Sequence, residues 1–201
     1  MTSIQRLTTR RALLALAAAC AAALLSASAL AASPADTAAN APAATVVDIV
    51  GRTVEIPAKV DRILLGEGRF LYALALIEGD QPLARIAGWQ GELPFADPNG
   101  YADYRRRFPA IDRIPVIGRT SEDSVSAEQS VSTRPDIAIF GLGGHGPGRQ
   151  SGLVNDLKKA GVPVVFIDFR AQPVRNTLAS MRILGKACLL YTSDAADDLL
   201  C

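Results

Sequence analysis

The chain has 201 residues, of which 21 are Lys or Arg and 20 are Asp or Glu, and its formal net charge is +1. Nucleic acids and anionic membrane surfaces attract proteins with a basic excess, so this balance gives no support for either as a partner. A metal site needs clustered His, Cys or carboxylate ligands, whereas this chain has one His and three Cys, the latter confined to its end segments. We therefore expect no metal site and no bound cofactor.

The first 31 residues have the pattern of an export signal. Arg6, Arg10 and Arg11 precede an apolar run of Ala and Leu, and residues 29–31 supply a small-x-small cleavage pattern. The paired arginines also resemble a twin-arginine signal, and Cys20 after three alanines resembles part of a lipoprotein box. A retained membrane helix is a further alternative. We expect a periplasmic protein, exported by the Sec or the twin-arginine route.

The rest of the sequence divides into four parts. Residues 32–44 are rich in Ala, Pro, Ser and Thr without apolar periodicity, which is typical of a disordered linker. Residues 45–172 form an α/β lobe, and 173–187 begin a long helix. Residues 188–201 resemble the in-frame translation of a sequencing adapter, the alternative being an ordinary acidic tail. We expect the native sequence to depart from this chain after Ala187.

Short apolar runs alternate with helical periodicities along the lobe. Two alternating segments, 46–50 and 53–56, flank Gly51-Arg52 and predict a hairpin. The other predicted elements are, in chain order, a strand at 60–65, a helix at 70–78, a strand at 83–87, a helix at 101–108, a strand at 137–140, a helix at 151–160, a strand at 162–167 and a helix at 173–187. This alternation predicts an α/β fold with a largely parallel sheet flanked by helices.

Four loops follow predicted strands and should meet at one edge of the sheet. They are 66–69, 88–91, 141–148 and 168–170, the first three being rich in glycine. Open α/β sheets bind their ligands at this edge. Arginines there would pair with carboxylate or hydroxamate oxygens of an anionic ligand, and a tryptophan would pack on its apolar faces. The candidate ligand-binding residues are Arg69, Trp89, Gly143, His145 and Arg170.

Each of these candidates also has a purely structural alternative. Trp89 equally fits a core anchor, and the arginines Arg69 and Arg170 fit helix caps or partners of a nearby acid. His145 fits a polar loop residue.

Nucleotide binding and catalysis are less well supported than ligand capture. The glycine loop is interrupted by Pro147 and Gly148 before any helix begins, and no Gly-Lys-Ser/Thr element occurs. His145 is the sole candidate base, and no Gly-x-Ser-x-Gly turn accompanies it. We predict a non-catalytic protein. An exported α/β enzyme using His145 remains one alternative, and a transporter-independent sensor or structural module is another.

Five segments of the chain follow one another in a characteristic order and spacing. They are Asp48-x-x-Gly-Arg-Thr-Val-x-Ile-Pro57, Arg62-Ile-Leu-Leu65, Pro135-Asp-Ile-Ala-Ile-Phe140, Gly161-Val-Pro-Val-Val-Phe166 and Leu184-Gly-Lys186. Together they resemble the periplasmic binding proteins of iron-siderophore, haem and vitamin B12 ABC importers.

The resemblance implies two lobes joined by a long helix, with this chain supplying the N-terminal lobe and residues 173–187 the start of the helix. It implies a ligand held between the lobes, with an iron-siderophore favoured over cobalamin, or over haem held by a side chain such as His145 or Tyr101. It also implies an inner-membrane ABC permease as partner. Glu128, seven residues before Pro135, matches the glutamate that docks onto permease arginines, while a solvated helix-face acid is the alternative.

Overall fold

The computed structural model describes residues 42–119, 121–143 and 146–188. The predicted signal, His145 and the tail beyond Cys188 lie outside these ranges.

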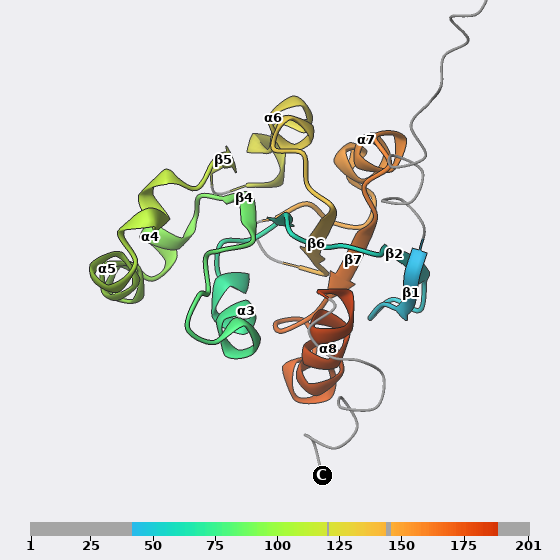
Figure 1. The fold of residues 1–201 in the computed structure, drawn as a ribbon, viewed down its shortest axis with the longest axis horizontal. Helices are drawn as coiled ribbons and strands as arrows, with labels where there is room; N and C mark the ends of the chain where they lie inside the picture. Colours follow the sequence, from blue (N-terminus) through green and yellow to red (C-terminus); the bar gives the residue numbers. More distant parts are fainter. Residues whose placement is uncertain (1–41, 120, 144–145, 189–201) are drawn as a thin grey trace, which may run out of the picture. The chain divides into compact units, whose positions relative to one another are not determined.

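Strands and helices alternate along the described chain (Figure 1). The strands are β1 (Pro42–Val47), β2 (Thr53–Pro57), β3 (Ile63–Leu65), β4 (Ile86–Gln90), β5 (Val116–Gly118), β6 (Ile137–Gly141) and β7 (Val164–Ile167). The helices are α3 (Phe70–Glu78), α4 (Leu93–Ala96), α5 (Pro98–Arg107), α6 (Ala127–Ser132), α7 (Gly152–Lys159) and α8 (Pro173–Ala187), with 3-10 turns at Pro109–Arg113 and Glu122–Ser124.

The predicted parallel sheet is confirmed. Five strands pair in the order β5-β4-β3-β6-β7, and every neighbouring pair is parallel. The chain moves outward from β3 to β5, then crosses β3 to continue with β6 and β7. The direction of winding therefore changes between β3 and β6, at the centre of the sheet.

Helices cover both faces of the sheet. Alternate residues of the central strands point to opposite faces, so that Leu65 and Ile139 pack with α3 and α8, while Leu64 and Phe140 pack with α7. Figure 1 shows α3 and α8 on one side of the strands and α6 and α7 on the other. Both faces are thus buried, as the continuous apolar runs of the strands predict.

The hairpin is confirmed, but its first strand lies earlier than predicted. β1 begins at Pro42, inside the 32–44 segment predicted as linker, and pairs antiparallel with β2. It ends before Asp48 because the Asp48 carboxylate accepts the N–H groups of Val50 (3.1 Å) and Arg52 (2.9 Å) and folds the chain into a turn.

The strand predicted at 83–87 and the loop predicted at 88–91 are corrected by the structure. β4 continues through Gly88 and Trp89 to Gln90, while a turn occupies the preceding residues. The sequence predicts Gly88 in a loop, whereas in the structure its lack of a side chain allows close packing inside β4. A Cβ there would lie 2.9 Å from Thr133 Cγ2.

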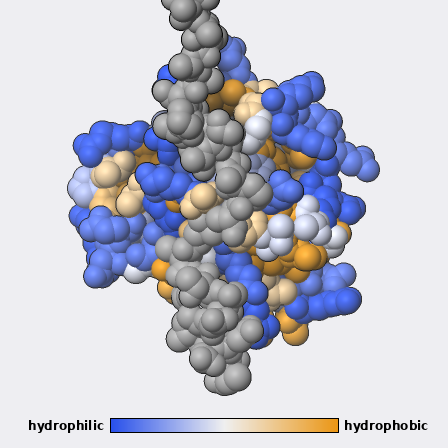
Figure 2. Space-filling model, turned by 45° about the vertical axis from the view of Figure 1, so that its right-hand side comes forward, coloured by the Kyte–Doolittle hydropathy of each residue, from blue (hydrophilic) through white to orange (hydrophobic). Residues whose placement is uncertain are grey.

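Several apolar side chains reach the surface beside β1 and α8. Val47, Val174 and Leu178 are exposed, and Figure 2 shows hydrophobic residues among hydrophilic ones on the face that it presents. Within the described ranges, no helix combines the length and apolar content that a membrane span requires.

Candidate functional site

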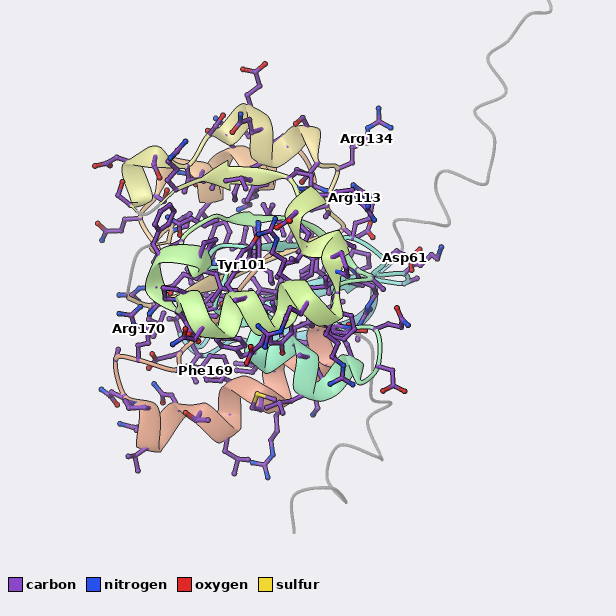
Figure 3. All side chains as sticks on the ribbon, turned by 90° about the vertical axis from the view of Figure 1, so that its left-hand side faces the viewer. Asp61, Tyr101, Arg113, Arg134, Phe169 and Arg170 are labelled. Carbon is purple, nitrogen blue, oxygen red and sulfur yellow. The ribbon has the colours of Figure 1, made fainter. Side chains whose placement is uncertain are left out.

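The carboxyl ends of the five parallel strands meet at one edge, as predicted. Because the winding direction changes between β3 and β6, their following loops diverge to opposite faces and mark the usual ligand position of such sheets. Figure 3 shows Phe169 and Arg170 on this side of the molecule, while Asp61, Arg113 and Arg134 lie on the opposite side.

Two of the predicted arginines are brought together here by a buried glutamate. The Glu67 side chain is 1% exposed, and its Oε2 accepts hydrogen bonds from Arg69 Nη2 (3.0 Å) and Arg170 Nη1 (3.4 Å). Glu67 thus links the loop after β3 to the loop after β7. We call Glu67, Arg69, Arg170 and Glu92 the edge cluster.

The second carboxylate of the edge cluster holds the backbone of the same loop. Glu92 is buried and accepts the backbone N–H groups of Gly68 (2.8 Å) and Arg69 (3.0 Å). Its Oε1 also lies 3.6 Å from Arg69 Nε, a distance that suits an ion pair and exceeds a hydrogen bond. Arg69 is therefore held by two acidic side chains, the pairing named above as its structural alternative, and its assignment as a ligand-binding residue stays a prediction.

Two glycines that flank the undescribed part of the loop after β6, Gly141 and Gly146, pack against Glu67 and its neighbour Gly66. A Cβ on Gly146 would lie 2.2 Å from the backbone oxygen of Gly66, and one on Gly141 would lie 3.2 Å from Glu67 Oε1. Only a residue without a side chain allows this approach at position 146. Gly141 and Gly146 thereby contribute to the burial of the Glu67 side chain.

The loop that carries Arg170 is shaped by Asp168. The carboxylate of Asp168 accepts the N–H groups of Arg170 (2.9 Å), Ala171 (2.7 Å) and Gln172 (3.0 Å) and an amide N–H of Asn176 (2.7 Å). Burial opposes ionisation of this carboxyl, but the Asn176 and backbone hydrogen bonds outweigh it and hold the pKa of Asp168 below its ordinary value.

Trp89 is buried in the core. It is the next-to-last residue of β4, is 2% exposed and packs near Tyr101 with ring centroids 6.5 Å apart. The structure thus corrects the predicted placement of Trp89 in a loop. Its burial leaves almost no surface for contact with a ligand.

The other predicted site residues take different positions. Gly143 is exposed, with open space where a Cβ would stand, so its backbone is accessible but steric need does not explain the glycine. His145 lies outside the described residues. Glu128 is exposed in the first turn of α6, where Ser126 Oγ caps the helix by accepting the N–H of Gln129 (3.2 Å).

Sequence reasoning missed three charged residues of this edge. Glu67 and Glu92 both follow strands, yet their function as partners of Arg69 depends on contacts that no local pattern reveals. Arg119 follows β5 directly and is exposed, so its place after a strand was a usable signal.

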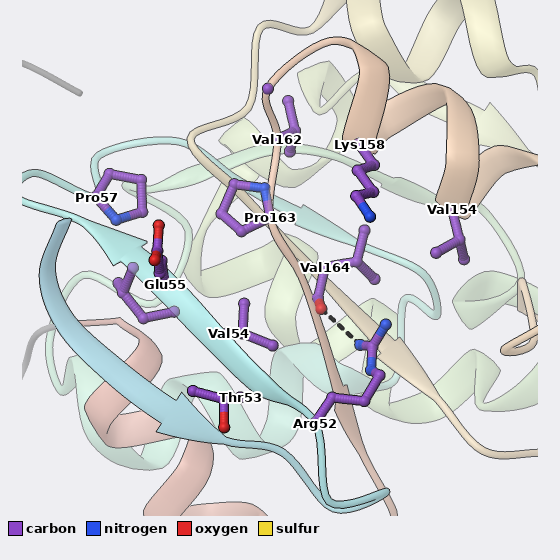
Figure 4. A pocket seen from close by; sticks show the side chains of 12 residues that line it. Arg52, Thr53, Val54, Glu55, Pro57, Val154, Lys158, Val162, Pro163 and Val164 are labelled. Atoms are coloured by element: carbon purple, nitrogen blue, oxygen red, sulfur yellow. Dashed lines mark hydrogen bonds between the residues drawn. The ribbon is translucent and has the colours of Figure 1, made fainter. Parts of the chain in front are cut away.

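A hollow of about 570 Å³ lies away from the edge cluster, between β2 on one side and α7 and the start of β7 on the other (Figure 4). Arg52 spans part of it and donates to the Val164 carbonyl oxygen (2.7 Å). In the described ranges, no group of three or more His, Cys, Asp or Glu side chains could hold a metal ion.

No family model and no curated protein matches the chain. Among solved structures, it is similar to FepB, a TroA-like periplasmic binding protein from Veillonella parvula, with a TM-score of 0.62 and 20% identity over 77% of this chain and 44% of that one. It is similar to the molybdate-bound periplasmic binding protein MolA of Haemophilus influenzae, with a TM-score of 0.56 and 15% identity over 78% and 49% of the two chains.

Staphylococcus aureus SirA, solved in complex with staphyloferrin B, gives a TM-score of 0.52 and 18% identity over 78% of this chain and 45% of that one. The chain therefore spans about half the length of the structures that it matches. Its fold is that of the N-terminal lobe of a two-lobed periplasmic binding protein.

Proposed function

We propose that the chain is the N-terminal lobe of the solute-binding component of an ABC importer, which captures a ferric siderophore in the periplasm and delivers it to a membrane permease. The observation that carries the proposal is the edge cluster. It places two guanidinium groups at the carboxyl edge of the sheet, held by buried carboxylates, where this fold binds its ligands.

The chemistry of the cluster suits recognition. A guanidinium group presents five N–H donors in a fixed plane and pairs well with chelating oxygens, and Arg170 retains a side-chain exposure of 42%. The solved structures similar to this chain include one with molybdate and one with staphyloferrin B, so the fold accommodates oxygen-rich ligands. Cobalamin and haem are the competing ligand classes.

We propose that a second lobe supplies the other half of the pocket. We expect the native sequence to continue past Ala187 into a second lobe, with α8 as the start of the connecting helix. The exposed apolar side chains Val174 and Leu178 on α8 support this, because a second lobe would cover them.

Calorimetric titration tests the proposal. The protein, produced with the native sequence that follows Ala187, is titrated with a ferric siderophore, haem, cobalamin and molybdate. We expect the ferric siderophore to bind, and Arg170→Ala to weaken that binding by about tenfold through loss of a charge-assisted hydrogen bond.

The matched control is Arg113→Ala, since Arg113 is an exposed arginine on the opposite side of the molecule (Figure 3). It should leave the affinity unchanged. Binding of haem, cobalamin or molybdate in place of the siderophore would show that the ligand class is wrong, and binding of none would remove the support for solute capture.

A further inference from the structure

We propose that Glu67 sets the charge specificity of the ligand site, so that the site selects ferric chelates of zero or low net charge over polyanionic chelates. Its carboxylate neutralises and orients Arg69 and Arg170, which then act through directed hydrogen bonds. This inference rests on the proposed function and names the ligand class more narrowly.

The first support is the position of Glu67 between the two arginines. A single carboxylate oxygen accepts from Arg69 Nη2 at 3.0 Å and from Arg170 Nη1 at 3.4 Å, which fixes the two guanidinium groups relative to each other. The arginines come from loops after different strands, so no backbone connection would otherwise align them. Glu67 is the link.

The second support is the burial of that carboxylate. Glu67 is 1% exposed, and two glycines pack against it: a Cβ would lie 3.2 Å from Glu67 Oε1 at Gly141 and 3.0 Å from Glu67 Cγ at Gly146. An ion removed from water interacts strongly with neighbouring charges, because little solvent screens it. Glu67 therefore reduces the electrostatic attraction that Arg69 and Arg170 would otherwise exert on an anionic ligand.

The third support is the charge count. The edge cluster holds two arginines and two buried glutamates, so its formal charge is zero. Such a cluster offers little net attraction to a ligand with several negative charges. Each guanidinium nevertheless carries five N–H donors, and its bond to Glu67 occupies only part of them. The remaining donors suit the oxygen atoms of a neutral chelate.

The test compares the affinities of two probes, a neutral ferric trihydroxamate and a trianionic ferric tris-catecholate, measured by calorimetry on the protein with its native continuation. The wild type should prefer the neutral chelate. Glu67→Gln keeps the size of the side chain but removes one negative charge, so that the net charge of the cluster rises by one. It should shift the affinity ratio by about tenfold toward the trianion.

Two further variants make the test decisive. Glu55→Gln makes the same charge change at an exposed side chain of β2 and should leave the ratio unchanged. Arg170→Gln removes a positive charge from a more exposed side chain and should shift the ratio by about tenfold in the opposite direction, even if Glu67→Gln fails to fold.

The outcomes separate this inference from the proposed function. A wild type that prefers the trianion, or a Glu67→Gln variant that weakens both probes by the same factor, would overturn the role of Glu67 while leaving siderophore capture intact. A wild type that binds neither probe would overturn both.

Discussion

Asp168 determines the shape of the loop that presents Arg170. One buried carboxylate accepts three backbone N–H groups and the Asn176 amide, so its charge is satisfied without a cation. We expect Asp168→Asn to lower the free energy of unfolding by about 2 kcal/mol at neutral pH, because the amide is a weaker acceptor and its NH2 group would face N–H donors that one carboxylate oxygen now accepts.

The pH dependence of this effect has a definite sign. The folded-state pKa of Asp168 lies below its unfolded value, so its stabilisation is fully present above the unfolded pKa of about 3.9 and is lost as the pH falls through the folded pKa. In urea titrations, wild type and Asp168→Asn should therefore converge in stability below about pH 4. Asp80→Asn, at an exposed acid, serves as control. A stability difference independent of pH would show that the carboxylate charge is irrelevant.

Trp89 contributes to stability through burial. We expect Trp89→Ala to lower the free energy of unfolding by about 3–5 kcal/mol, because it leaves a large cavity between β4 and Tyr101. Leu76→Ala, at a side chain 77% exposed, should change it by less than about 0.5 kcal/mol. Denaturant titration measures both. Retained stability with lost ligand affinity would instead restore Trp89 as a binding residue.

Among the elements, the hairpin is attached to the edge of the sheet by Arg52, together with hydrogen bonds that join Asp48 and Ile49 to Phe166. Arg52 donates to the Asp48 carboxylate and to the Val164 carbonyl oxygen, and its guanidinium lies 4.6 Å from the centre of the Phe166 ring. These contacts occupy the outer edge of β7, which would otherwise be open to pairing with another chain.

We expect Arg52→Ala to destabilise the protein by about 2 kcal/mol, since it leaves the buried Asp48 carboxylate without its cation. The loosening should be local. Amide hydrogen exchange should accelerate at Ile49, which donates to the Phe166 carbonyl oxygen, and at Phe166 itself, while the β3 amides keep their protection. Lys59→Ala, which removes an exposed ion pair, is the control. Equal acceleration throughout the sheet would contradict a local role.

The elements differ in how well their sequence predicts them, for physical reasons. The apolar periodicity of α3 with Gly79 after it predicted both ends of that helix, and Pro173 predicted the start of α8. The prediction of a loop at Gly88 was wrong, because a glycine required by packing inside a strand has the same local signal as a loop glycine. In the site, the arginines could be predicted from their place after strands. Their partners could not, because Glu92 reaches Gly68 across 24 residues of chain.

At the scale of the whole molecule, one strand connects the two surfaces that the proposed function requires. β6 ends at Gly141, which packs against Glu67, and α6, which carries Glu128, precedes this strand. Glu128 lies in the first turn of α6 and is exposed, so it contributes to no described core contact and is available to a partner. An exposed carboxylate facing a permease arginine would set the rate and the register of docking more than the final affinity.

We therefore expect Glu128→Ala to leave ligand affinity unchanged and to lower the rate of transport in reconstituted vesicles by about tenfold, with Glu128→Lys lowering it further through repulsion. Gln129→Ala, at the adjacent exposed position, should transport normally. Raised ionic strength should slow transport by the wild type and have less effect on Glu128→Ala, because salt screens an interaction that the variant lacks. Loss of ligand affinity in Glu128→Ala would instead assign Glu128 to the pocket, and unchanged transport would assign it to the solvated surface. The two variants at neighbouring positions thus separate a docking contact from the general tolerance of α6 to substitution.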